Sequence, residues 1–342
     1  MKNITSSIAS LSITAILTAC GGGSGGGNNS IPTPIPTPNP IVQADIQTSV
    51  QALTYPTESE EFAFVSAYND FRSKLGLGLL AQNTILDTAA TNHLRYVLAN
   101  DINNGGTVNM SAINPAYNRP NFHIEDKDKI NFTGSQEIDR ANFIDYGGNY
   151  VGESGAFGGG KGSITAFDSL VSTAYYRIGL MYQFPRDIGV VVGTDQSQTV
   201  IMEFGVKRKG QTNAIDYFGV YSADKQDGVP LHAGVENPNP FPDLSTSNAD
   251  FPSKTSFPIN VLIQESLKLT VNNFTVTETG KTTPLDVRLL TQENDTNKYL
   301  AANTAFIVGK APFKPNTLYI VAFSGMAGNT SVSKSWSFTT KN

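Results

Sequence analysis

The spacing of apolar residues changes once along the chain, and this change limits the folds that the chain can adopt. Between residues 58 and 181, apolar positions recur at helical intervals in three stretches, as at Phe62, Val65 and Tyr68. Beyond residue 255 only short β-like runs remain, separated by turn residues. We therefore predict an α+β protein, with a layered domain of helices and antiparallel sheet followed by a small all-β sandwich.

Local patterns assign the elements of the first domain. Helical spacing predicts helices within 58–77, 83–101 and 163–181, and two β-like runs at 187–195 and 198–208 predict an antiparallel hairpin. His93 falls on the apolar face of the second helix, which predicts a core or capping histidine. Residues 103–162 are rich in Gly, Asn and Pro, which is typical of long loops, where functional sites often lie.

Residues 226–254 are rich in Pro, Asn and Ser without periodicity, which predicts a linker between a first domain at 56–225 and a second at 255–342. The second domain contains six predicted strands, within 257–264, 266–278, 284–292, 304–309, 317–325 and 333–340. Its ending, FKPNTLYIVAFSG followed by WSFTT, resembles bacterial Ig-like domains, with Phe313 where those domains usually have Leu.

The N-terminus has the pattern of an export signal. Residues 1–20 carry Lys2 and then an apolar stretch, 8–17, which is too short to span a bilayer and is typical of a secretory signal. The stretch ends in Leu-Thr-Ala-Cys at Cys20, which resembles the lipobox of bacterial lipoproteins, in which the thiol is lipidated. An ordinary signal peptide with an incidental cysteine is the alternative. Residues 21–55 begin Gly/Ser-rich and continue Pro-rich, a composition typical of a tether.

The lipobox resemblance implies a cell-envelope protein whose membrane partner is reached through an N-terminal lipid at Cys20. Gly21 after the cysteine indicates outer-membrane delivery in bacteria with two membranes. Cys20 is the only cysteine, so an acylated chain has no disulfide, no disulfide-linked partner and a fold held by its core alone. The net charge of −5 without basic clusters argues against nucleic acid as a partner.

Several short motifs occur in an order that resembles a known family. The first helix contains Asn69, Arg72 and Gly76-Leu77; His123-Ile124-Glu125 and Phe132-Thr133-Gly134 follow, and then Gly152-Glu153. This ordered set, over about residues 58–225, resembles the superfamily of cysteine-rich secretory, antigen-5 and pathogenesis-related proteins (CAP, or SCP-like, domains), particularly its secreted bacterial branch. The resemblance implies an α-β-α sandwich.

The resemblance also implies a central cleft in which two His and two Glu can hold a divalent cation. His123 matches the first histidine and Glu153 one glutamate, whereas Tyr176-Arg177 stands where the family has His-Arg. The predicted cleft residues are His123, Glu125, Glu153, Tyr176 and Arg177. The other glutamate has only Asp168 as a positional candidate.

A phenol, with a reference pKa of about 10, is a poorer metal ligand than imidazole at neutral pH. We therefore expect no required cofactor and at most weak divalent-cation binding, with His123 and Glu153 as the candidate ligands.

Two functions are compatible with these features. The first is a non-catalytic binding module whose cleft takes a small lipid or a cell-wall fragment. The second is a secreted hydrolase acting on peptide, peptidoglycan or nucleic acid, with His123 and Glu153 as its catalytic residues. Tyr176 in place of a second imidazole weakens metal binding and proton relay but suits an aromatic-lined cleft, so we favour binding over catalysis. A purely structural or adhesive role is the third possibility.

Overall fold

The computed structural model describes residues 43–342. The predicted signal peptide, Cys20 and most of the predicted tether lie outside the described residues. The last tether residues belong to the folded body: Asp45 pairs with Thr212, and the Gln47 side chain donates to the carbonyl of Leu79 at 2.8 Å. The body therefore begins before residue 56. Within the described part, no helix is long and apolar enough to cross a membrane.

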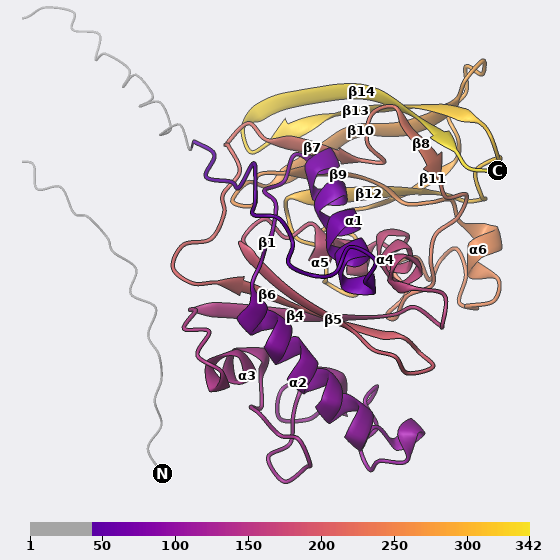
Figure 1. The fold of residues 1–342 in the computed structure, drawn as a ribbon. Coiled ribbons are helices and arrows are strands. Elements are labelled where there is room, and N and C mark those ends of the chain that lie inside the picture. Colours follow the sequence, from indigo (N-terminus) through magenta and orange to yellow (C-terminus); the bar gives the residue numbers. More distant parts are fainter. Residues whose placement is uncertain (1–42) are drawn as a thin grey trace, which may run out of the picture. The chain divides into compact units, whose positions relative to one another are not determined.

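The first part of the body is built on a four-stranded sheet in the order β1-β5-β6-β4. Its strands are β1 (Ala81–Gln82), β4 (Tyr150–Phe157), β5 (Asp187–Val192) and β6 (Thr199–Val206). Strands β5 and β6 are antiparallel, which confirms the predicted hairpin. Helices α2 (Thr84–Asn100) and α3 (Glu137–Phe143) cover one face, and α1 (Glu60–Leu75), α4 (Ser163–Val171) and α5 (Tyr175–Leu180) cover the other (Figure 1).

Capping residues fix the ends of the two long helices. The Ser59 hydroxyl accepts the amide of Phe62 at the start of α1, and Gly76 ends that helix with a φ of 72°, which favours glycine. The Asn83 side chain caps α2 in the same way. Both helices lie where the sequence predicts them.

The helix predicted within 163–181 is in fact two helices, because the chain turns between α4 and α5. At the turn, the hydroxyls of Ser172 and Thr173 donate to backbone carbonyls three residues earlier, at 2.8 and 2.7 Å. Such bonds compete with the helical pattern. The buried carboxylate of Glu236 then accepts the amides of Ala174 and Tyr175, at 2.7 and 2.8 Å, and so holds the start of α5.

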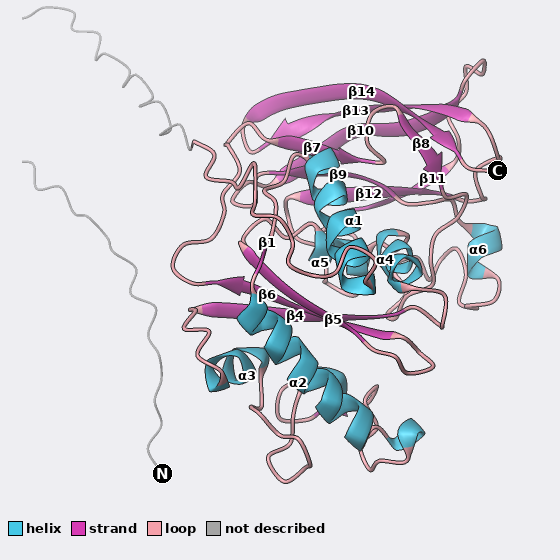
Figure 2. Cartoon of the chain, viewed as in Figure 1, coloured by secondary structure: helices cyan, strands magenta, loops and turns pink. Residues whose placement is uncertain are grey.

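The second part consists of two four-stranded sheets, ordered β10-β13-β14-β8 and β11-β12-β9-β7, one above the other (Figures 1 and 2). Each of the six predicted strand segments contains a strand. The strands are β7 (Phe218–Tyr221), β8 (Gln226–Val229), β9 (Ile259–Ile263), β10 (Leu269–Glu278), β11 (Val287–Leu290), β12 (Thr304–Gly309), β13 (Leu318–Ala327) and β14 (Thr330–Thr340). Residues 43–342 therefore form an α+β protein.

Short elements complete the chain. They are the 3-10 turns η1 (Ile102–Asn104) and η2 (Asn121–His123), the strand pair β2 (Ile113–Asn114) and β3 (Arg119–Pro120), and α6 (Phe251–Lys254).

The two parts share one apolar core. Strand β7 lies in the range predicted for the first domain but pairs with β9 of the second. The predicted linker, 226–254, contains β8, which pairs with β14, and α6. These contacts place much of the segment against the body, whereas independent folding of the two parts stays a prediction.

Candidate binding cavity and buried charge network

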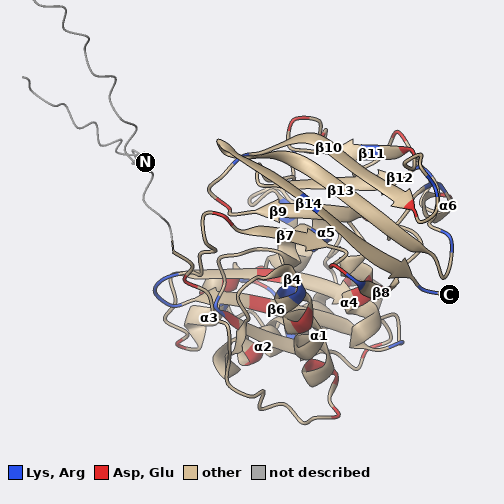
Figure 3. Cartoon of the chain, turned by 90° about the horizontal axis from the view of Figure 1, so that it is seen from above, with Lys and Arg blue, Asp and Glu red and all other residues tan. Residues whose placement is uncertain are grey.

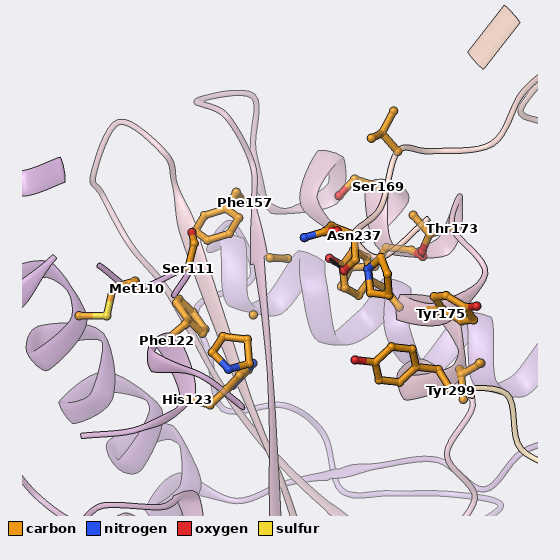
Figure 4. A pocket seen from close by; sticks show the side chains of 18 residues that line it. Met110, Ser111, Phe122, His123, Phe157, Ser169, Thr173, Tyr175, Asn237 and Tyr299 are labelled. Carbon is orange, nitrogen blue, oxygen red and sulfur yellow. Dashed lines mark hydrogen bonds between the residues drawn. The ribbon is translucent and has the colours of Figure 1, made fainter. Parts of the chain in front are cut away.

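A cavity of about 800 Å³ opens between the two parts of the body. Figure 4 shows Met110, Phe122, His123 and Phe157 along one side, and Thr173, Tyr175, Asn237 and Tyr299 along the other. The first wall comes from η2, β4 and the loop before them; the second comes from the α4–α5 turn, the 235–238 segment and the loop before β12. The cavity is therefore assembled from segments far apart in the sequence.

His123 reaches this cavity from η2, a turn held by hydrogen bonds of its neighbours. The amide of Phe122 donates to the carbonyl of Met110 at 2.9 Å, and the Asn121 side chain donates to Asn109 at 2.9 Å. The imidazole, 22% exposed, directs Nδ1 at the carboxylate of Glu153, 2.7 Å away. This arrangement makes Nδ1 the donor, and Nε2 has no hydrogen-bond partner among the described residues.

Glu153, on β4, has no solvent exposure at its side chain and lies behind His123. Its second oxygen is hydrogen-bonded to the guanidinium of Arg140 from α3. Burial alone would raise the pKa of Glu153, but the charges of Arg140 and His93 and the hydrogen bond from His123 lower it well below the usual range. Glu153 is therefore an ionised, buried carboxylate that orients His123.

Glu125 lies deeper, beside His93 of α2, and does not line the cavity. His93 is fully buried, as the sequence predicts, with Nδ1 3.0 Å from Glu125 and Nε2 2.7 Å from the carbonyl of Phe122. Glu125 also accepts the amides of Thr133 and Gly134, at 2.6 and 3.3 Å, so it has the contacts of a carboxylate. Both ring nitrogens of His93 are therefore engaged, one with a carboxyl group and one with a backbone carbonyl.

Two members of this buried network were missed by the sequence analysis. Arg140 and Glu203 are buried, and the Arg140 Nη2 lies 3.6 Å from the Glu203 carboxylate. Neither Glu203 oxygen has a hydrogen-bond partner among the described residues. Burial raises the pKa of Glu203 well above the ordinary value, and the charge of Glu153 raises it further. The one available indication was Glu203 itself, a charge inside the otherwise uncharged strand TVIMEFGV.

The fold places the other predicted site residues, Tyr176, Arg177 and Asp168, in different surroundings. Tyr176 lines the cavity, is 44% exposed, and donates its hydroxyl to the carbonyl of Asn237 at 3.2 Å. Arg177 does not line the cavity: its side chain points the other way, into the core, and donates to Pro258 and Asn260 at 2.6 and 2.9 Å. Asp168 is exposed on α4 and also lies outside the lining. Adjacent positions on α5 therefore face opposite surroundings.

The residues fit a metal ion poorly. The facing atoms of His123 and Glu153 are hydrogen-bonded to each other, and the other Glu153 oxygen is taken by a guanidinium. In the part of the chain that the structure describes, no group of three or more His, Cys, Asp or Glu side chains is arranged to hold a metal. We derive no metal-dependent step.

Comparison with known proteins finds only distant structural similarity. The sequence matches no protein-family model and no curated protein. Among solved structures, the chain is similar to an outer surface protein from Borrelia burgdorferi, with 16% identity and a TM-score of 0.33 over 46% of this chain and 100% of that one. It is also similar to an extracellular protein containing a SCP domain from Bacillus anthracis, with 17% identity and a TM-score of 0.32 over 44% of this chain and 40% of that one.

Proposed function

We propose that the chain is a lipid-anchored protein of the bacterial cell envelope, with a CAP-type domain and an Ig-like domain, that binds a small lipid or a cell-wall fragment without chemical change. The single observation that carries the binding role is the cavity of about 800 Å³, within the size range of small-molecule sites. Its walls combine apolar and aromatic side chains with a few hydroxyl and amide groups. The anchor is inferred from the leader sequence and Cys20.

A hydrolase is the second candidate, and the His123–Glu153 pair favours it. An imidazole held by a carboxylate through Nδ1 leaves Nε2 able to accept a proton, as a general base does. No serine hydroxyl among the described residues is hydrogen-bonded to His123, so the nucleophile would be water. Among the described residues that line the cavity, His123 is the only imidazole and there is no carboxylate, so the lining offers no second group of these kinds for acid–base catalysis.

Blocking the cavity tests the binding role. Ser169 is an exposed residue of α4 that lines the cavity, whereas Thr165 is exposed on the same helix away from it. Ser169→Trp places an indole in the cavity, and Thr165→Trp is the matched control. We expect mass spectrometry of the full chain, purified from its native bacterium, to find a non-covalent ligand in wild type and Thr165→Trp but not in Ser169→Trp. An equal ligand content in all three would contradict binding in this cavity.

The anchor has a separate test. Cys20→Ser should move the protein out of the membrane fraction of its native bacterium, because the acylated thiol is the proposed attachment. Continued sedimentation of this variant with membranes would count against the anchor.

A further inference from the structure

Two tyrosines form an aromatic surface on the cavity wall opposite His123 (Figure 4). Tyr175 begins α5, and Tyr299 belongs to the loop between β11 and β12. Their ring centroids are 5.3 Å apart, at an interplanar angle of 58°. Tyr299 is 61% exposed, so a large ring faces the cavity mouth with much of its apolar surface uncovered.

Both tyrosines are fixed in place by one acidic residue. Asp295, only 5% exposed, accepts the hydroxyl of Tyr175 and, at 2.7 Å, the backbone amide of Tyr299. Asn297 donates to the Tyr175 hydroxyl at 3.1 Å. The Tyr175 ring and the backbone of Tyr299 are therefore held in position, and such ordering lowers the entropy cost of binding.

The cavity carries almost no charge. None of the 18 described residues that line it is Asp, Glu, Lys or Arg, and His123 is the only imidazole among them. A carboxylate, phosphate or ammonium group on a ligand would lose water without gaining a charged partner, which is costly. Besides the His123 imidazole and the hydroxyls of three tyrosines, the polar side chains in the lining are hydroxyls and an amide: Ser111, Ser169, Thr173 and Asn237.

We propose that the ligand is an uncharged glycan, with the apolar face of a sugar ring stacked on Tyr299 and Tyr175. A sugar ring matches this wall because it has an apolar C–H face for an aromatic ring and hydroxyls for neutral hydrogen-bonding groups. Fatty acids and phospholipids match it less well, because each carries a charged group. The inference rests on the proposed function and names the ligand class of the same cavity. It also requires both parts of the body, since Tyr299 comes from the second.

The test uses the full chain with chitohexaose and cellohexaose, two neutral oligosaccharides, in isothermal titration calorimetry. We expect saturable binding of at least one. Tyr299→Ala should weaken it by about tenfold or more, the effect of losing one stacked ring. Tyr299→Phe should retain it, because the Tyr299 hydroxyl has no hydrogen-bond partner within residues 43–342 and the ring is kept. Tyr182→Ala is the matched control, since Tyr182 is 47% exposed and lies outside the lining.

The outcomes separate the glycan from the wider proposal. Absence of binding to both oligosaccharides, or binding that Tyr299→Ala leaves intact, overturns the glycan assignment. If the chain then binds palmitate, and Ser169→Trp but not Thr165→Trp prevents this, the cavity is a lipid site and the proposed binding function stands. If neither ligand class binds and no co-purifying ligand is found, both proposals fail.

Discussion

Glu153 connects the cavity to the buried charge network, because its two oxygens face His123 and Arg140. Removing one partner of a buried ion pair leaves the other charge uncompensated, at a cost of about 3–5 kcal/mol. We therefore expect Glu153→Gln to lower the free energy of unfolding by about that amount, measured by urea denaturation at pH 7. Glu293→Gln is the control: the Lys268–Glu293 pair, 2.8 Å apart, is exposed, and such pairs contribute about 0–1 kcal/mol.

The pH dependence gives a second readout of Glu153. Its folded-state pKa is lowered, so its contribution to stability is present above its unfolded pKa of about 4.3 and is lost as the pH falls through the folded value. The Gln variant should lose less stability than wild type when the pH is lowered below about 4.3. Parallel curves for the two proteins would show that Glu153 is not ionised in the fold.

Glu203 should behave in the opposite way, because burial raises its folded-state pKa. Its contribution is fully present below about pH 4.3 and declines as the pH rises toward the folded value, by up to about 1.4 kcal/mol per pH unit. Glu203→Gln cannot ionise, so we expect it to be at least as stable as wild type at pH 8 and to show a flatter curve between pH 5 and 8. A Gln variant that is much less stable at pH 8 would indicate an ionised Glu203 that Arg140 requires.

At the level of elements, the start of α5 depends on a residue about sixty positions away. Burial raises the pKa of Glu236 to about 7, while its bonds to the amides of Ala174, Tyr175 and Tyr176 oppose that rise. Glu236→Ala should leave these amides without their acceptor and detach the 235–238 segment that lines the cavity. We expect faster hydrogen exchange at 174–176 in this variant and an intermediate rate in Glu236→Gln, which keeps one acceptor. Unchanged exchange would mean that the helix needs no such cap.

The elements that could be predicted from sequence are those set by neighbouring residues. The β5–β6 hairpin and the strands of the second part follow from local apolar patterns and turn residues. The break between α4 and α5 has a local component in the Ser172 and Thr173 hydroxyls, but the Glu236 carboxylate that holds the start of α5 is remote in sequence, so local patterns alone did not predict the break. For the site, His123 and Glu153 were predicted through the family resemblance and lie in contact. Arg140 was missed because a short helix near the surface gives no local indication of a buried guanidinium.

In the whole molecule, the charged residues are scattered, whereas the apolar core is continuous. Acidic and basic residues are interspersed along the ribbon of the described part of the chain (Figure 3). The apolar core, by contrast, runs through both parts, with Arg177 hydrogen-bonded across them. Its guanidinium also lies over the rings of Phe257 and Tyr221, 4.6 and 5.1 Å from their centroids. These contacts couple the two parts although the sequence predicts a linker between them.

The shared core and the exposure of residues 226–254 together determine where a protease should cut and whether the fragments should separate. Residues 246–250 are exposed, whereas Glu236 and Phe241 are buried, so cleavage should occur within 246–250 rather than across all of 226–254. Because the core is shared, we expect the two fragments to stay associated and to elute together in size-exclusion chromatography, separating only in denaturant. Arg177→Met keeps much of the side-chain volume but removes the hydrogen bonds to Pro258 and Asn260, so it should weaken this association. Nicked wild-type fragments that separate in native buffer would instead show two independently folding units.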